Sequence, residues 1–290
     1  MINYSFITPH KNSPELLMRY IDSIPERDDI EIIVVDDNSD DDKKPVINRM
    51  NLKVICLDAS QSNGAGHARN VGLEYATGQW VLFADSDDTY SETLLPTLDE
   101  IKDGKDDVVY FNHVVIRGNK ITENRFCEKG QQLSEEDCFK IRYGRTVPWN
   151  KAVRLDFLKK YNIQFEECPV GNDILFAYQV AYLTKENYRI VDLPLYNYYI
   201  NPGSINHRKK NNEAYYLTIC KHIYQRNAFY RFLGKGDKTR TMLSKFAAIL
   251  IKKGWSQFVL CFKVYMTQKE EIERDRSYFI DVIKSRESNG

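Results

Sequence analysis

The chain has 290 residues, of which 42% are hydrophobic, so it can bury one sizeable core and a smaller appended domain. Its N-terminus lacks the features of a signal peptide, and no run of roughly 18 uncharged apolar residues occurs, which predicts a cytoplasmic protein. The six cysteines lack zinc-binding spacing, and we expect no nucleic-acid partner.

The charge is distributed unevenly along the chain. Residues 1–204 hold 23 Lys and Arg against 33 Asp and Glu, whereas residues 205–290 hold 18 against 8. The change falls near a stretch rich in turn formers, NPGSINHRKKNN. We therefore predict a catalytic domain over residues 1–205 and a basic, aromatic-rich helical region over residues 206–290.

Short apolar runs alternate with amphipathic helical stretches in the first part, which predicts an α/β sheet covered by helices. The predicted elements, in chain order, are strands at 4–8, 32–35, 52–57 and 80–84, with a helix opening at 13–15 and another ending at 75. Further along, the predictions are strands at 108–112, 113–116 and 120–122, a capping box at 134–137, a tight turn at VPWNK leading into a helix, a helix from 172 or 173, and helical stretches at 215–233 and 242–266.

Two acidic loops follow the second and fourth predicted strands. The first reads DDNSDDD, and the second contains Asp85, Asp87 and Asp88. Because ligands of open α/β sheets bind at the carboxyl ends of the strands, both loops should border one crevice. Two carboxylates about 5 Å apart repel by roughly 3 kcal/mol at an effective dielectric constant of 20, so we expect a compensating positive charge. The alternative is a solvated turn in which Asp88 or Ser91 caps the next helix.

Four motifs occur together in a fixed order: VVDDNSDD, GAGHARNVGLEYATGQWVLFADSDD, VPWNKAVRLDFL and GNDILF. Over about residues 3–205 the chain thereby resembles glycosyltransferase family 2, whose inverting enzymes have the GT-A fold. The resemblance implies a mixed, mostly parallel sheet flanked by helices, here with a C-terminal helical extension. It also implies transfer of a sugar from a nucleotide-diphosphate sugar, expected to be UDP-linked, to a glycan or lipid-linked acceptor in bacterial surface polysaccharide synthesis.

The resemblance assigns donor-binding roles to specific residues. Pro9 opens the loop after the first strand, Asp37 accepts a hydrogen bond from the uracil N3 proton, and Arg69 donates to the base or the diphosphate. Asp85 lies near the ribose, and Asp87 ligates Mn²⁺ or Mg²⁺. Such hard ions bind through one or two carboxylates and phosphate oxygens, and the ion would supply the expected positive charge.

The same resemblance makes Asp173 the general base that takes the proton of the acceptor hydroxyl. An aspartate before an apolar helical run is also a common helix cap, and that alternative stays open. Its usual acidic neighbour is replaced here by Asn172. Trp149 of the PWNK motif is expected in the core rather than as an acceptor platform, and His207 is a further candidate metal ligand.

The family's P-x-Y-N motif reads Pro9-His10-Lys11-Asn12 here, which leaves the stacking partner of the base open, with His10 as a candidate. Two other functions are considered. The DxDxT pattern formed by Asp85, Asp87 and Thr89 fits a haloacid-dehalogenase-like phosphatase. A catalytically inactive nucleotide-sugar-binding module is the second. The basic C-terminal helices could pack on the catalytic domain, form a homo-oligomer, or hold the protein peripherally at an anionic membrane on the inner face of the plasma membrane.

Overall fold

The structure is a computed structural model that describes residues 1–125, 132–200 and 212–290. The chain divides into two compact units, one formed by Met1–Glu167 and Asn172–Ile200 and the other by Cys168–Gly171 and Asn201–Gly290. The predicted boundary at residues 205 and 206, like the candidate ligand His207, lies outside the described residues.

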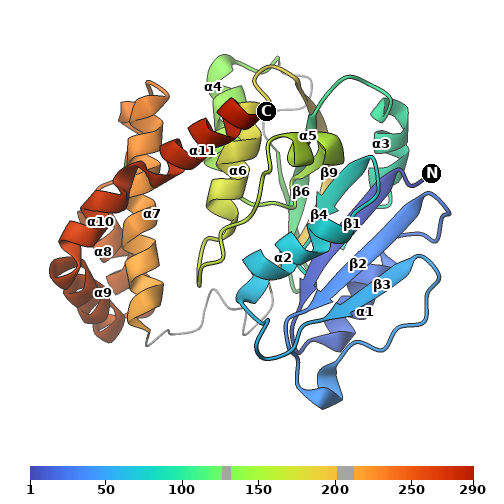
Figure 1. The fold of residues 1–290 in the computed structure, drawn as a ribbon, viewed down its shortest axis with the longest axis horizontal. Coiled ribbons are helices and arrows are strands. Elements are labelled where there is room, and N and C mark those ends of the chain that lie inside the picture. Colours follow the sequence, from blue (N-terminus) through green and yellow to red (C-terminus); the bar gives the residue numbers. More distant parts are fainter. Residues whose placement is uncertain (126–131, 201–211) are drawn as a thin grey trace. The chain divides into compact units, whose positions relative to one another are not determined.

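A nine-stranded mixed sheet forms the centre of the first unit (Figure 1). Its strand order is β3-β2-β1-β4-β8-β6-β9-β5, and β7 pairs with β6. The strands are β1 (Tyr4–His10), β2 (Ile30–Asp36), β3 (Leu52–Cys56), β4 (Trp80–Phe83), β5 (Thr89–Tyr90), β6 (Val108–Arg117), β7 (Lys120–Asn124), β8 (Lys151–Arg154) and β9 (Tyr188–Tyr199). The run β3-β2-β1-β4 is parallel throughout, and β8 joins it antiparallel to β4.

The helices of this unit cover both faces of the sheet (Figure 1). They are α1 (Pro14–Asp22), α2 (Gly64–Tyr75), α3 (Leu94–Ile101), α4 (Glu135–Phe139), α5 (Leu155–Lys160) and α6 (Asp173–Leu183). Side chains of α1 and α3 pack on one face, and those of α2, α5 and α6 pack on the other. The predicted fold class is thereby confirmed.

Alternation along the central strands explains why both faces are covered. On β2, Ile32 and Val34 belong to one core cluster, whereas Ile33 and Val35 belong to the other. All four side chains are buried, and burying such a side chain contributes about 1.5–3 kcal/mol. A strand that is apolar on both faces needs a helical layer on each side, which is the arrangement found in parallel sheets.

Two glycines let α2 approach its neighbours closely. A Cβ at Gly72 would lie 2.4 Å from Cγ2 of Ile7 on β1, and a Cβ at Gly66 would lie 2.1 Å from the carbonyl oxygen of Glu166. Larger residues would push the helix away from the sheet. Arg69 lies between the two glycines on α2. The close approach of this helix therefore determines how far from the sheet the Arg69 side chain begins.

The structure corrects two of the predicted elements in this unit. The strands predicted at 108–112 and 113–116 are one continuous strand, β6, which turns at Gly118 into β7. The tight turn predicted at VPWNK is present at residues 148–150, but a strand that the sequence did not predict, β8, separates it from α5 and lies between β4 and β6. Its Lys151 interrupted the apolar pattern that a buried strand normally shows. The capping box predicted at Ser134 and Asp137 is confirmed.

The second unit is a cluster of helices. They are α7 (Glu213–Phe232), α8 (Met242–Lys253), α9 (Trp255–Thr267), α10 (Lys269–Arg274) and α11 (Tyr278–Asn289). Helix α9 packs against both α7 and α8, around a core that includes Tyr216, Phe246 and Cys261. The stretch predicted to be helical from 242 to 266 is broken at Gly254, whose φ of 89° most residues avoid.

None of the helices in the described residues is both long and apolar enough to cross a lipid bilayer.

Candidate functional site

The predicted site residues of the first unit gather where β1, β2 and β4 end. Strand β1 pairs with β4 only as far as Ile7 and then continues to His10. The chain order reverses here, because β2 and β3 lie on one side of β1 and β4 lies on the other. Such a switch point opens a crevice at the carboxyl ends of the strands. Pro9 lies beside it, paired with Val35 of β2.

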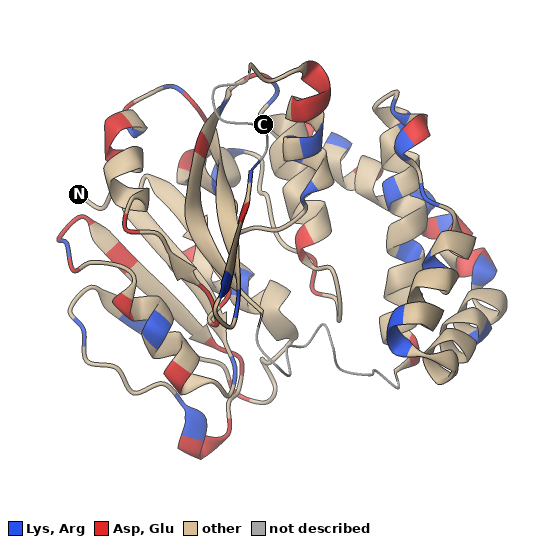
Figure 2. Cartoon of the chain, turned by 180° about the vertical axis from the view of Figure 1, so that it is seen from behind, with Lys and Arg blue, Asp and Glu red and all other residues tan. Residues whose placement is uncertain are grey.

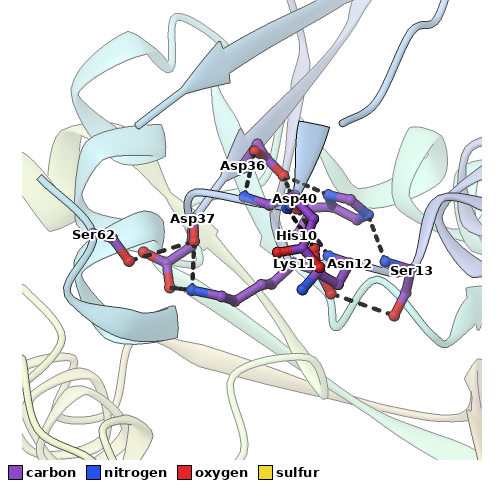
Figure 3. Close-up of polar contacts among 9 residues, drawn as sticks. His10, Lys11, Asn12, Ser13, Asp36, Asp37, Asp40 and Ser62 are labelled. Carbon is purple, nitrogen blue, oxygen red and sulfur yellow. Dashed lines mark hydrogen bonds and ion pairs between the residues drawn. The ribbon is translucent and has the colours of Figure 1, made fainter. Parts of the chain in front are cut away.

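Asp37, directly after β2, is held between two loops (Figure 3). The Lys11 Nζ donates to the carbonyl oxygen of Asp37 at 2.8 Å and lies 3.7 Å from its Oδ2. The amide of Gly64, at the start of α2, donates to Oδ1 at 3.4 Å. Asp37 is 6% exposed, whereas the Lys11 side chain is 51% exposed. A fixed carboxylate at the edge of a crevice can accept a hydrogen bond from a planar base.

His10 has a structural role that the sequence did not reveal (Figure 3). Its Nδ1 lies 2.7 Å from Oδ1 of Asp36, and both side chains are fully buried. Because the amide of Ser13 donates to Nε2 at 3.2 Å, Nδ1 must carry the hydrogen and donate to Asp36. Ser39 donates to the same carboxylate through its amide and its hydroxyl. The hypothesis that His10 stacks on a base is therefore wrong, and Lys11 occupies the position of the family's tyrosine.

Arg69 links two parts of the site. Its NH2 group donates to Oδ1 of Asp85 at 2.5 Å, and its NH1 group donates to Oδ1 of Asn172 at 3.0 Å. The side chain is 6% exposed, so Arg69 is not a solvated arginine on the helix surface. Its Nε is buried and has no hydrogen-bond partner among the described residues. One guanidinium thus joins the loop after β4 to the start of α6.

The chain itself relieves part of the repulsion among the three aspartates after β4. Asp88 is buried, and it accepts hydrogen bonds from Tyr196 Oη at 2.8 Å and from the Tyr199 amide at 2.7 Å. Burial, assisted by the charge of Asp85, raises the pKa of Asp88 to about 9. The amide of Asp85 in turn donates to Tyr196 Oη at 3.1 Å. Asp88 is therefore a structural, largely protonated group and caps no helix.

Asp85 and Asp87 remain as the acidic groups that reach solvent, both of them half-buried. Arg19 of α1 donates to the backbone oxygen of Asp87, and its guanidinium lies 3.8 Å from the centre of the Tyr199 ring. The donor set is thus two carboxylates on one short loop, flanked by Arg19 and Arg69. Oxygen donors of this kind fit Mg²⁺ or Mn²⁺ that completes its coordination with phosphate and water.

Asp173 is the first residue of α6, and Asn172 occupies the N-cap position. Among the described residues no side chain caps this helix, so the structure does not support the cap interpretation. Burial raises the pKa of Asp173, while the guanidinium of Arg69 opposes that shift. The charge of Asp85 raises the pKa further, and the ammonium of Lys151 lowers it. A half-buried carboxyl with a raised pKa is suited to general-base chemistry.

Lys151 and Trp149 of the PWNK motif are both buried. The Lys151 Nζ donates to the carbonyl oxygen of Val147 and, at 2.6 Å, to Oδ1 of Asn150. Burial lowers the pKa of Lys151 to about 7, while the charge of Asp173 opposes the shift. Trp149 stacks on Tyr196 with the ring centres 4.6 Å apart, which agrees with the expected core role.

A cavity of about 260 Å³ lies apart from these groups, where Ile24, Tyr90 and Leu95 are among its lining residues. Its lining comes from β1, the segment that follows α1, β5 and the start of α3. Titratable groups of the kind described above converge instead at the strand ends, so the chemistry of the chain is centred there.

Sequence reasoning found the carboxylates but missed Lys11, Tyr196 and Lys151. Of these three, only Lys151 stands out in the sequence, because a lysine directly before the apolar pair Ala152-Val153 is unusual in a buried strand. Tyr196 lies more than 100 residues from the loop that it supports, and no local pattern marks such a contact.

Comparison with known proteins points to the same family as the sequence motifs. Residues 5–162 match the model of the family described as "Glycosyl transferase family 2". In the crystal structure of Staphylococcus aureus TarS 1–349 in complex with UDP-GlcNAc, the same fold covers 99% of this chain and 91% of that chain, with a TM-score of 0.64 and 22% identity.

Curated relatives are bacterial enzymes. The poly(ribitol-phosphate) beta-N-acetylglucosaminyltransferase TarS of Staphylococcus aureus is 31% identical over 208 residues, which are 68% of this chain and 35% of TarS. The chain thus spans about a third of that relative. The GalNAc(5)-diNAcBac-PP-undecaprenol beta-1,3-glucosyltransferase of Campylobacter jejuni is 30% identical over 270 residues, 82% of this chain and 85% of that enzyme.

The family match overturns the alternative of a haloacid-dehalogenase-like phosphatase, because the acidic loop follows β4 of a glycosyltransferase sheet. The carboxyl ends of the strands carry the carboxylates in the order in which the family's motifs occur. The chain therefore belongs to glycosyltransferase family 2, as its motifs predicted.

Proposed function

We propose that the chain transfers a sugar from a UDP-sugar to a hydroxyl group of a lipid-linked glycan, with inversion at the anomeric carbon. The observation that carries this proposal is the bridge made by Arg69 between Asp85 and Asn172. It fixes the donor-binding loop relative to the first turn of the helix that bears Asp173. A transferase needs such a fixed relationship, since donor carbon and acceptor hydroxyl must meet in one geometry.

The donor half of the site follows from the two acidic loops. Asp37 accepts a hydrogen bond from the uracil N3 proton, and Lys11 holds its backbone in place. Asp85 faces the ribose and Asp87 supplies a ligand for a divalent ion, Mn²⁺ or Mg²⁺. When bound, such an ion stabilises the negative charge that develops on the departing diphosphate. The buried guanidinium of Arg69, with its unpaired Nε, adds positive charge on the same side.

The acceptor half depends on Asp173. Its carboxylate takes the proton from the acceptor hydroxyl as the hydroxyl oxygen bonds to the anomeric carbon and the bond to the diphosphate breaks. The proton ends on Asp173, the electron pair ends on the UDP, and one displacement inverts the anomeric centre. An α-linked UDP-sugar therefore gives a β-linked product. The relatives above are named as beta-transferases, in agreement with this outcome.

The acceptor class rests on how much of each relative is matched. The match to TarS, which acts on poly(ribitol-phosphate), covers 35% of that protein. The matches to two enzymes named for undecaprenol-linked acceptors cover 85% of the Campylobacter jejuni enzyme and 75% of the Escherichia coli enzyme WfaP. A lipid-linked glycan is accordingly the favoured acceptor, and synthesis of a bacterial surface polysaccharide the favoured role.

A donor screen tests the proposal. The purified chain is incubated with Mn²⁺ and, separately, UDP-glucose, UDP-N-acetylglucosamine and GDP-mannose, and release of the nucleoside diphosphate is measured with and without undecaprenyl-diphosphate glycans. We expect slow release from one UDP-sugar alone and faster release with acceptor. NMR of the product should show a β linkage. Tight binding of a UDP-sugar without any turnover would instead identify an inactive binding module, and an α-linked product would reject single displacement.

A further inference from the structure

Two consecutive helices of the second unit expose rows of large apolar side chains. On α8, Leu243 is 77% exposed and Ile251 is 82% exposed, and Leu250 and Ala247 are also exposed. These positions follow the spacing i, i+4, i+7 and i+8, so they share one face of the helix. The opposite face, with Phe246 and Ile249, packs into the core of the unit. The exposed row is therefore separate from the residues that hold the helices together.

Helix α9 also exposes apolar side chains, of which Phe262 in addition packs against Phe246 with the ring centres 5.5 Å apart. The exposed apolar residues on this helix are Trp255, Val259, Phe262 and Met266, spaced i, i+4, i+7 and i+11. Trp255 is 68% exposed and follows Gly254, the residue at which the two helices meet. Ile251 and Trp255 thus flank one corner. Isolated exposed apolar residues are common on proteins, but a row of them on each of two consecutive helices indicates a surface that binds something.

Charge indicates what this surface binds. Residues 242–267 contain four lysines and no acidic residue. Over residues 231–267 there are eight Lys and Arg, and Asp237 is the one acidic residue. Lys252 and Lys253 lie within the corner itself, between Ile251 and Trp255. Bands of Lys and Arg on the C-terminal helices are visible in Figure 2.

The other lysines of this region are less available to a partner than Lys252. Lys253 donates to the hydroxyl of Tyr215 at 3.2 Å, and Lys245 and Lys263 lie on two different helices. Lys245 is half-buried, and Lys263 forms an ion pair with Glu213 at 3.0 Å. The feature that can reach a partner is the apolar corner with Lys252 beside it.

We infer that the corner formed by Ile251, Lys252, Gly254 and Trp255, with the apolar rows on α8 and α9, docks onto the surface of an anionic lipid bilayer. A bilayer accepts aliphatic side chains in its acyl region, an indole ring at the headgroup level and lysines against its phosphates. The purpose of this docking rests on the proposed function, because a lipid-linked acceptor is confined to the membrane. A second protein copy carrying the same lysines would meet a surface of like charge.

The tryptophans provide a direct probe. The chain contains three, and Trp80 and Trp149 are buried at 1% and 6% exposure, so Trp255 is the one that solvent and lipid can reach. The full chain is mixed with phosphatidylcholine vesicles with or without phosphatidylglycerol, and with vesicles containing brominated lipid. We expect flotation with the phosphatidylglycerol vesicles, a blue shift of the emission, and quenching of Trp255 by bromine. Salt at about 0.5 M, where screening is short-ranged, should weaken the attachment severalfold.

Variants distinguish binding through the corner from nonspecific adsorption of the protein to vesicles. The double variant Ile251→Gln with Trp255→Gln should lose about tenfold or more of vesicle binding, because a bilayer interface takes up apolar area. The matched control is Val46→Gln with Met50→Gln, two residues of the first unit that are 96% and 97% exposed. It should float like the parent chain. Circular dichroism should show that both variants keep their helical content.

Several outcomes would overturn the inference. One is the absence of flotation and of quenching with anionic vesicles at low salt. Another is a dimer, seen by light scattering without lipid, that the corner variant abolishes, since a second copy would then cover the surface. Release of UDP from the donor without acceptor needs no membrane and should be the same in the corner variant. Failure of docking and failure of the proposed function are therefore distinguishable.

Discussion

Oδ1 of Asp85 lies 2.5 Å from the NH2 group of Arg69, and the same guanidinium reaches Asn172 at 3.0 Å. Asp85 follows β4, whereas Asn172 precedes α6. The two hydrogen bonds fix the distance between the loop after β4 and the first turn of α6, to which the proposed function assigns donor binding and catalysis. This bridge leads to the first of five predictions.

The variant Arg69→Lys keeps a positive charge but loses the planar pair of donors. We expect kcat/KM to fall by about a hundredfold, because a lysine cannot hold Asp85 and Asn172 at once. Steady-state kinetics with the identified donor measures the effect. Arg49→Lys, another arginine with a largely buried side chain that binds backbone oxygens away from the site, is the matched control. Equal losses in both variants would reduce Arg69 to a general structural residue.

Asp87 and Asp88 are adjacent but should behave oppositely when each is replaced by asparagine. Asp87→Asn removes a charged oxygen ligand, so kcat/KM should fall by about three orders of magnitude, as is typical when an electrostatic group at the developing charge is lost. Asp88→Asn should change activity by less than about tenfold, because Asp88 with a pKa of about 9 is already largely uncharged near neutral pH. Full activity of the Asp87 variant in EDTA would reject metal assistance.

Asp88 also predicts a pH dependence of stability. Its pKa is raised in the folded chain from 3.8 to about 9, so the folded state binds this proton more tightly than the unfolded state does. Stability should therefore fall as the pH rises between those two values. In Asp88→Asn this contribution is absent, and its melting temperature relative to the parent should rise from pH 5 to pH 8. A constant difference across that range would contradict the assignment.

The fourth prediction concerns the decline of kcat at acidic pH, which depends on the pKa of Asp173 and on the charge of Lys151. Because burial raises the pKa of Asp173, kcat should decline at a higher pH than for an ordinary aspartate. The ammonium of Lys151 lowers that pKa, so Lys151→Met should move the limb to still higher pH. Above pH 7 the difference should shrink, because Lys151, with its pKa lowered to about 7, loses its own charge there.

The controls for this prediction are Lys159→Met, on the exposed surface of α5, and Asp173→Asn. The first should leave the profile unchanged. The second should retain UDP binding, measured by calorimetry, while transfer falls by several orders of magnitude. An unshifted profile in Lys151→Met with an otherwise folded protein would show that Lys151 is only a structural residue.

Lys11 predicts an effect on donor binding alone. Lys11→Ala removes the hydrogen bond that holds Asp37, so KM for the UDP-sugar should rise by about threefold to tenfold while kcat stays nearly constant. Lys11→Tyr restores the family's motif and should recover the binding through stacking on the base. Lys53→Ala, a lysine on β3, is the control. A fall in kcat without a change in KM would place Lys11 in the chemical step instead.

The sequence by itself determined the family, the α/β class and the positions of the carboxylates. These properties depend on local patterns: apolar runs such as VVD and VLFAD identify buried strands, and polar residues that follow them must lie at the strand ends. Local patterns also predicted the start of the first helix, which has a proline at its first position, and the capping box at Ser134.

Only the tertiary structure decided how the charges are compensated and which neighbours act on each group. From the sequence, a metal ion was the one group expected to compensate the charges of the three aspartates after β4. The fold also brings Arg69, Arg19 and Tyr196 to that loop. It buried His10 against Asp36 and broke the last long helix at Gly254. Each of these depends on contacts between segments far apart in the chain or on a single backbone angle. Local patterns of hydrophobicity carry no information about either, because packing and burial arise only when the elements meet.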